Sequence, residues 1–327
     1  YYVAPLDEET DFLKISSAEE LKIIDPACGS GHMLTYAFDL LYAIYEEEGY
    51  PPSEIPGLIL THNLYGTEID PRAGALAGFA LTMKARAAQR TFFSKSVAPG
   101  ICVIEPISFS LDEIDLLVGS VADRDQTEAF WLQFADADVL GSLIRPDDRL
   151  AELLAEHING LAADGDLLKA DVLSRAHRVV KQARWLANRY SVVVANPPYM
   201  GANSMGTTLS AFSKVDYRRS KSDLFAMFVE RSVQLATARG YVAMITMQAW
   251  LFLSTYEALR GAVLDATTPV SLAQLGPRAF DTISGEVVST AAFVLAKDGA
   301  RTARARFMRL GAFNSEATKN ADLLRQA

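Results

Sequence analysis

A short apolar segment that leads into a glycine-rich turn and then into a long helical pattern constrains the fold of this chain more than any other feature. Residues 21–25 read Leu-Lys-Ile-Ile-Asp, residues 26–31 read Pro-Ala-Cys-Gly-Ser-Gly, and residues 33–48 have the apolar spacing of a helix. A strand, a tight turn and a helix in this order bring bare backbone to the carboxyl edge of a sheet, where open α/β folds bind their ligands. The sequence therefore predicts a ligand site at this turn.

The two glycines of the turn, Gly29 and Gly31, permit a ligand to approach the backbone closely. The N-terminus of the following helix offers free N–H groups to a carboxylate or a phosphate. A tight turn without any ligand uses glycine in the same way, so this motif alone leaves both interpretations open. The third glycine of a dinucleotide-binding turn is missing at its usual spacing.

Strands and helices alternate along much of the chain, which predicts an α/β fold with a mostly parallel sheet and right-handed crossovers. Further strands are expected at residues 64–68, 101–104, 191–195 and 241–246, with a closing strand pair at 270–275 and 289–296. Further helices are expected at residues 71–90, 224–239 and 256–266. Residues 50–63 contain three prolines and are expected to form a break with a short helical turn.

The alternation stops between residues 111 and 189, where the sequence is rich in Ala, Leu, Asp and Arg at helical spacing. We interpret this stretch as a helical insertion. The chain then divides into residues 1–110, with the glycine turn, the insertion at 111–189, a second part of the α/β domain at 190–311 and a tail at 312–327. Residues 200–222 are expected to form a polar loop.

Composition restricts the function classes. The 327 residues carry 31 basic and 40 acidic side chains, a formal charge of −9, which argues against a protein that coats nucleic acid by bulk electrostatics. The sequence shows no long apolar stretch and no N-terminal leader pattern, so we expect a cytoplasmic protein with no membrane contact. The first residue is Tyr rather than Met, which suggests a piece of a longer protein. Cys28 and Cys102 indicate neither a disulfide framework nor a metal site, and are expected to be small core residues.

Two acidic residues follow the second expected strand. Glu68 lies 37 residues after Gly31, and a carboxylate at the end of this strand can accept both hydroxyl hydrogens of a ribose. Asp70 precedes Pro71, a pattern typical of a helix N-cap. We therefore assign Glu68 to the ligand and Asp70 to the cap. By the same criterion Asp223 is expected to cap the helix that begins at residue 224.

The most informative tetrapeptide is Asn-Pro-Pro-Tyr at residues 196–199, directly after an apolar strand. The two prolines fix the backbone and remove two N–H donors, so the carbonyl groups of the turn remain free as rigid acceptors. The amide oxygen of Asn196 and the carbonyl of Pro197 can accept both hydrogens of an amino group, while Pro198 stiffens the turn. This arrangement frees the nitrogen lone pair for attack in the transition state. Tyr199 offers a flat face for stacking a substrate.

Together, residues 25–31 (DPACGSG), 65–71 (YGTEIDP) and 194–199 (VANPPY) resemble the ordered motifs of amino-group DNA methyltransferases of the adenine-N6 type. Residues 30–39, 83–86, 196–201 and 221–228 further resemble the PglX-type methyltransferases of BREX phage-defence systems and the related type IIG restriction-modification enzymes. The resemblance implies a Rossmann-like methyltransferase fold with a mostly parallel seven-stranded sheet. It also implies double-stranded DNA as partner, with other phage-defence proteins as further candidates.

The resemblance also implies S-adenosylmethionine as methyl donor and assigns residues to it. The glycine turn would hold the methionine part of the donor, through Asp25, Pro26, Ala27, Cys28, Gly29 and Gly31. Glu68 would hold the ribose, Ile69 would pack on the adenine ring, and Glu105 would lie near the adenine amino group. Tyr199 and Phe280 would stack on the flipped target base.

Two departures from the family pattern leave alternatives open. The Thr-Pro motif that the family carries before its glycine turn is not found in residues 1–20, and no recognition domain follows residue 310. A protein glutamine methyltransferase uses the same tetrapeptide, because a planar amide nitrogen poses the same chemical problem. The interval of 165 residues between Gly31 and Asn196 and the long 200–222 segment favour the DNA enzymes. A DNA-binding or docking subunit without turnover is the other alternative.

Overall fold

A single eight-stranded sheet forms the centre of the protein in the computed structural model, which describes residues 12–118, 123–161, 166–276, 289–298, 304–310 and 318–319. The strand order is β3-β2-β1-β4-β5-β7-β6-β8. The strands are β1 (Ile23–Asp25), β2 (Leu64–Glu68), β3 (Gly100–Val103), β4 (Tyr190–Ala195), β5 (Ala236–Met247), β6 (Thr267–Gly276), β7 (Thr290–Lys297) and β8 (Arg306–Arg309). The predicted mostly parallel α/β fold is confirmed, with one strand more than the seven expected.

The five strands from β3 to β5 are parallel to one another, and β7 runs antiparallel between β5 and β6. The eighth strand, β8, pairs parallel with β6 at the far edge of the sheet. It carries the basic residues Arg306 and Arg309.

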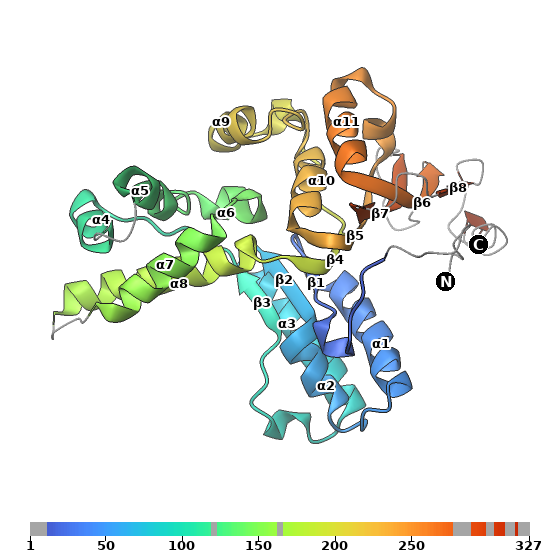
Figure 1. The fold of residues 1–327 in the computed structure, drawn as a ribbon, viewed down its shortest axis with the longest axis horizontal. Coiled ribbons are helices and arrows are strands. Elements are labelled where there is room, and N and C mark those ends of the chain that lie inside the picture. The colour runs from blue at the N-terminus through green and yellow to red at the C-terminus, as the bar shows by residue number, and fades with distance from the viewer. Residues whose placement is uncertain are drawn as a thin grey trace.

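Helices cover both faces of the sheet (Figure 1). The helices are α1 (His32–Glu47), α2 (Ile55–Leu58), α3 (Pro71–Ala88), α4 (Leu111–Val118), α5 (Arg124–Leu132), α6 (Ala137–Leu140), α7 (Asp148–Gly160), α8 (Leu167–Ala187), α9 (Thr207–Asp216), α10 (Leu224–Leu235) and α11 (Glu257–Ala266). Alternate strand residues enter two different cores, since successive side chains of a strand point to opposite faces. Ile23 packs with α1 and α3, whereas Ile24 and Val193 pack with α8, α10 and α11.

Two predicted boundaries are wrong. The helix expected at residues 224–239 ends at Leu235, because Ala236 already pairs with Tyr190 as the first residue of β5. The segment 200–222, expected as a loop, contains the short helix η5 (Ala202–Ser204) and the helix α9. Helix α9 buries Leu209 on one side, and its polar composition hid this amphipathic pattern in the sequence.

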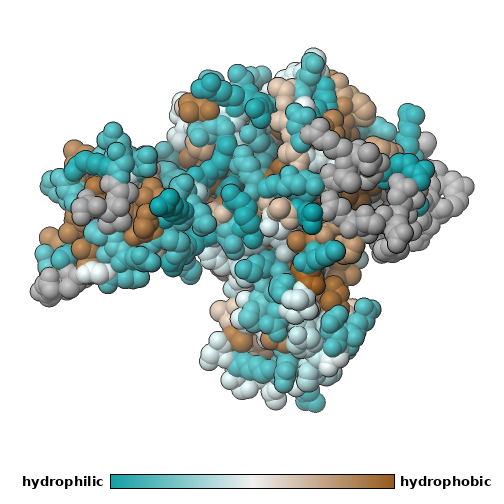
Figure 2. Space-filling view, in the orientation of Figure 1, coloured by the Kyte–Doolittle hydropathy of each residue, from teal (hydrophilic) through white to brown (hydrophobic). Residues whose placement is uncertain are grey.

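In its described parts, the stretch from 111 to 189 contains five α-helices, and its inner side chains belong to the same core as Ile24 and Val193. Helices α4, α5 and the outer halves of α7 and α8 project away from the sheet in Figure 1. The face seen in Figure 2 is largely hydrophilic, with apolar side chains in separate patches. Among the helices of the described residues, none has the length and apolarity needed to cross a bilayer.

Candidate functional site

The predicted turn between β1 and α1 is formed, and its two glycines have different roles. Gly29 and Gly31 have φ values of 52° and 84°, a region that side chains other than glycine rarely occupy. A Cβ atom on Gly31 would lie 3.1 Å from Ala77, so Gly31 lets α1 and α3 pack closely. A Cβ atom on Gly29 would meet nothing within 4 Å. Gly29 therefore borders open space at the carboxyl edge of the sheet, where a ligand can approach.

Glu68 links the end of β2 to this turn. Its Oε2 accepts a hydrogen bond from the backbone N–H of Gly29 at 2.8 Å. Its Oε1 accepts from the N–H groups of Ile69 and Asp70 at 2.9 and 3.0 Å. The carboxylate of Glu68 is thus held in one orientation beside the glycine turn, which is the arrangement that a preformed acceptor for a ligand hydroxyl requires.

Asp70 serves as the helix cap that its sequence context predicts. Its Oδ1 accepts from the backbone N–H of Arg72 at 2.9 Å at the start of α3, and its carboxylate forms an ion pair with the Arg72 side chain. These contacts confirm the predicted N-cap role of Asp70. Glu68, in contrast, accepts one hydrogen bond from Gly29 in the glycine turn, so the two neighbouring acids contact different segments.

Asp25, the last residue of β1, is buried, and its Oδ1 accepts from the backbone N–H of Ala27 at 3.1 Å. The pKa of Asp25 is raised to about 7, mainly by burial and to a smaller extent by the charge of Glu68, while the hydrogen bond from Ala27 lowers it. Two carboxylates in this position favour a cationic ligand, because a positive charge between them stabilises the ionised form of Asp25.

The raised pKa of Asp25 predicts a pH-dependent stability. A carboxyl group whose pKa rises from about 3.8 to about 7 on folding contributes stability that is fully present below pH 4 and is lost as the pH rises through 7. Relative to Asp25→Asn, the wild-type protein should lose up to about 4 kcal/mol of unfolding free energy between pH 4 and pH 8. Chemical denaturation of both proteins across this range measures the difference. Equal pH slopes in the two proteins would contradict the assignment.

The assignment of Pro26, Ala27 and Cys28 to the methyl donor stays a prediction. Pro26 and Cys28 are buried, and the backbone N–H of Cys28 donates to the carbonyl of Thr67 at 3.1 Å. Burial raises the pKa of the Cys28 thiol well above its ordinary value, and raises that of Cys102 to about 11. A thiol in this state is a poor nucleophile. The prediction that both cysteines are small core residues is confirmed.

The Asn-Pro-Pro-Tyr turn follows β4 directly, and β4 is a parallel neighbour of β1 in the sheet. Asn196 and Pro198 are exposed, whereas Pro197 is buried. The Tyr199 ring packs edge-on against Phe225, with ring centroids 5.9 Å apart, and keeps 38% of its surface exposed. The turn thus presents an amide side chain and an anchored aromatic ring at the same sheet edge as Asp25 and Glu68.

Asp223 fixes the chain that follows this turn. Its Oδ1 accepts from the backbone N–H of Phe225 at 3.2 Å, which confirms its predicted cap role on α10. The same oxygen accepts from the N–H of Met200 at 3.1 Å, and the N–H of Leu224 donates to the Met200 carbonyl at 2.9 Å. Burial raises the pKa of Asp223. The contact with Met200 joins positions 23 residues apart, and the sequence carried no signal for it.

Three predicted site residues remain, namely Ile69, Glu105 and Phe280. Ile69, immediately after Glu68, is 43% exposed. Glu105 is exposed beyond the end of β3, and its carboxylate forms an ion pair with Arg178 of α8 at 3.0 Å, a partner that the sequence did not indicate. The role of Glu105 towards a ligand stays a prediction. Phe280 lies outside the described residues.

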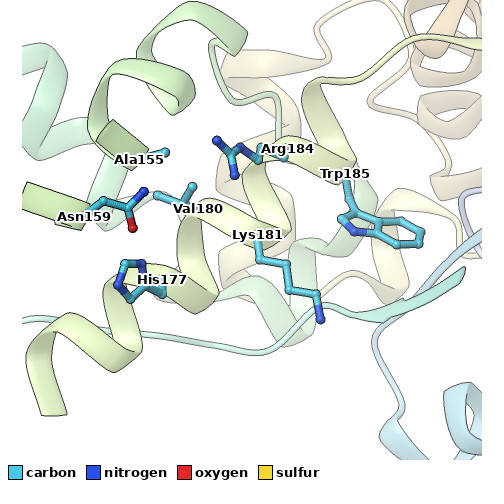
Figure 3. Close-up of a pocket in the computed structure, with 7 residues that line it drawn as sticks. All are labelled: Ala155, Asn159, His177, Val180, Lys181, Arg184 and Trp185. Atoms are coloured by element: carbon cyan, nitrogen blue, oxygen red, sulfur yellow. The ribbon is translucent and has the colours of Figure 1, made fainter. Parts of the chain in front are cut away.

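A separate pocket of about 170 Å³ lies between α7 and α8 (Figure 3). It is lined by Ala155, Asn159, His177, Val180, Lys181, Arg184 and Trp185. Its Arg184 is paired with Glu152 at 2.6 Å. None of these lining residues belongs to the predicted donor or target-base site, so the pocket does not mark that site.

The sequence profile of the Eco57I restriction-modification methylases matches residues 62–280. The chain belongs to this family. The adenine-specific methyltransferase BrxX of Escherichia coli O9:H4 (strain HS) is 38% identical over 98% of this chain and 29% of its own length. The adenine-specific methyltransferase PglX of Lacticaseibacillus casei (strain Zhang) is 36% identical over 94% of this chain and 26% of its own length. The chain thus spans less than a third of these curated relatives.

Solved structures show the same fold for this Eco57I-family chain. The type ISP restriction-modification enzyme LlaGI, in complex with a DNA substrate mimic, superposes with a TM-score of 0.56 at 13% identity over 94% of this chain and 23% of that one. The DrdV–DNA complex gives 0.53 at 14% identity over 94% of this chain and 26% of that one. The expected Rossmann-like methyltransferase fold and the expected family are both confirmed.

Proposed function

We propose that this chain is the catalytic core of a site-specific DNA adenine-N6 methyltransferase of a BREX-type phage-defence or restriction-modification system. The observation that carries the proposal is the position of the turn at residues 196–199 on β4, next to β1 with its glycine turn and one strand from β2 with Glu68. A donor site and an amino-group site then share one sheet edge, as transfer between them requires. The adenine-specific names of the curated relatives support the same reaction.

The donor side fits S-adenosylmethionine, which supplies a methyl group on a positively charged sulfur. The open space over Gly29 admits a ligand against the backbone, and the carboxylates of Asp25 and Glu68 suit its positive charge and its ribose hydroxyls. Ile69 offers an exposed apolar face for the adenine ring. These residues bind and orient the donor; none of them needs to move a proton.

On the target side, the Asn196 amide oxygen and the Pro197 carbonyl accept the two hydrogens of the adenine amino group. This frees the nitrogen lone pair for attack and stabilises the transition state more than the ground state. The target base must leave the duplex to reach the turn, which costs a few kcal/mol. Stacking on Tyr199, whose ring is anchored on Phe225, offsets part of that cost.

Double-stranded DNA is the proposed partner, because restriction-modification enzymes of this fold have been solved with DNA bound. Other proteins of the defence system are proposed as further partners. A glutamine side chain in a protein remains the competing substrate, since its amide nitrogen poses the same problem of a delocalised lone pair. A docking subunit without turnover remains the competing non-enzymatic function.

Modification-sensitive sequencing of host DNA tests the proposal. Cells that carry the complete gene should contain N6-methyladenine at one recurring sequence motif, and cells without the gene should lack it. Purified protein with labelled donor should transfer label to DNA and none to glutamine-containing peptides. Label in peptide alone would establish the glutamine reaction, and donor binding without any transfer would establish the scaffold function.

A further inference from the structure

One segment of the helical stretch between β3 and β4 reaches the donor site. Residues 141–144 (Gly-Ser-Leu-Ile), which follow α6 and include η4 (Gly141–Leu143), are all buried. The hydroxyl groups of Ser142 and Thr67 share a buried hydrogen bond of 2.7 Å. Thr67 immediately precedes Glu68 in β2, so this bond attaches the segment to the strand end that carries the donor residues.

The same segment also contacts the Ile69 side chain, through the backbone of Gly141. A Cβ atom on Gly141 would lie 2.6 Å from Cγ2 of Ile69, a separation that real Cβ atoms do not adopt. Gly141 also has φ 49° and ψ −130°, which side chains other than glycine disfavour. The backbone of Gly141 therefore lies directly against the Ile69 side chain, and no larger residue at position 141 permits the same approach.

Arg231 of α10 holds this segment from the other side. Its guanidinium is buried and donates to the carbonyl groups of Ser142 at 2.7 Å, Ile144 at 3.0 Å and Leu186 at 2.6 Å. A buried arginine bonded to three carbonyl oxygens orders those three chain positions, since each lost bond would leave a buried polar group unsatisfied. Burial lowers its pKa to about 10, so it stays charged at neutral pH.

Tyr217, at the end of α9, also holds the segment at residues 141–144 in place. The Tyr217 hydroxyl donates to the Leu143 carbonyl at 2.8 Å, and the Arg145 guanidinium lies over the Tyr217 ring at 3.9 Å. The segment is therefore fastened to α10 and to the end of α9 on one side, and to β2 on the other. In Figure 1, α6, which leads into the segment, lies to the left of α10 and above the strands β2 and β3.

We propose that Gly141 and Ser142 are positioning residues of the donor site, which set the side chain of Ile69 and the end of β2 for the adenine half of the methyl donor. This proposal rests on the proposed function. It extends the donor site to a segment about 70 residues further along the chain that none of the sequence motifs includes. A purely structural role would stabilise the protein without a specific effect on the adenine half of the donor.

A matched pair of threonine variants separates the two roles. Thr67 and Thr127 are both fully buried, and the Thr127 hydroxyl donates to the Asp123 carbonyl in α5, far along the chain from the donor motifs. Thr67→Val leaves Ser142 without its partner, and we expect about a 5- to 10-fold weaker affinity for S-adenosylhomocysteine by calorimetry. Thr127→Val should bind the same ligand with wild-type affinity, and Thr67→Ser, which keeps the hydroxyl, should recover most of the loss.

Two further measurements use the protein that contains this chain. Thr67→Val should lose affinity for 5′-methylthioadenosine, which keeps the adenine half of the donor, by the same factor as for S-adenosylhomocysteine. Its KM for DNA should stay unchanged. Gly141→Ala should weaken both ligands at least as much as Thr67→Val. Equal losses in Thr67→Val and Thr127→Val, or unchanged affinity in Thr67→Val, would overturn the proposal. Because ligand binding is measured without turnover, absence of DNA methylation by the wild type would count against the proposed function alone.

Discussion

Asn196→Ala is expected to reduce DNA methylation by about 10²- to 10⁴-fold while donor affinity stays within about twofold of wild type. Asn196 is exposed directly after the end of β4, so its replacement should leave the fold intact. Its loss removes one of two acceptors for the amino hydrogens, and the nitrogen lone pair then stays delocalised. Single-turnover methylation of DNA and calorimetry with S-adenosylhomocysteine measure the two quantities separately.

Asn159→Ala provides the matched control for this experiment. Asn159 is an exposed asparagine on α7, beside the pocket of Figure 3 and outside the proposed site. Its replacement should leave both methylation and donor affinity unchanged. Methylation at the wild-type rate by Asn196→Ala would refute the catalytic role, whereas a loss of donor affinity that matches the loss of rate would assign Asn196 to the donor instead of the base.

Glu68→Ala is expected to weaken donor affinity by about 10- to 100-fold. The variant loses a charged hydrogen-bond acceptor, and the glycine turn that Glu68 holds becomes less ordered. The Glu68 carboxylate accepts from three backbone N–H groups, including that of Gly29, so its removal should affect both the proposed ribose contact and the proposed methionine contact. Glu68→Gln should lie between wild type and Glu68→Ala. Calorimetry with the donor measures all three affinities.

The neighbouring acid is the control for Glu68. Asp70→Ala removes the N-cap of α3 and should lower the unfolding free energy by about 1 kcal/mol. It should leave donor affinity unchanged, because the Asp70 side chain faces Arg72 and not the glycine turn. If donor affinity falls equally in Glu68→Ala and Asp70→Ala, donor binding depends on the general structure of the connection between β2 and α3. That result would contradict the specific role of Glu68.

The sequence predicted those parts of the molecule that depend on short-range patterns. A turn with two glycines after an apolar strand, a capping acid before Pro71, and an Asn-Pro-Pro-Tyr turn after a β-branched strand are all encoded within a few residues. The carboxyl ends of parallel strands meet at one edge of a sheet, so these patterns predicted an edge that carries Asp25, Glu68 and Asn196. The order of the strands was not predicted from the sequence.

The features that were missed depend on contacts between distant segments. Residues 236–239 at the start of β5 look helical, and only the pairing of Ala236 with Tyr190 of β4 decides otherwise. The ion pair of Glu105 with Arg178 and the contact of Asp223 with Met200 join positions 73 and 23 residues apart. Gly141 has no neighbouring motif at all, and its reason for being glycine is the Ile69 side chain.

The position of β1 in the middle of the sheet has a consequence for how this protein is synthesised. Ile23 pairs with Leu64 on one side and with Val192 on the other, so one edge of β1 acquires its partner 169 residues later. At translation rates of about 5–20 residues per second, that edge stays unpaired for roughly 8 to 34 seconds of synthesis. An unpaired parallel edge is a template for association with other chains. Nascent chains that stop before Tyr190 should therefore aggregate more than chains that extend beyond β5, in which β1 and β4 both have their parallel neighbours.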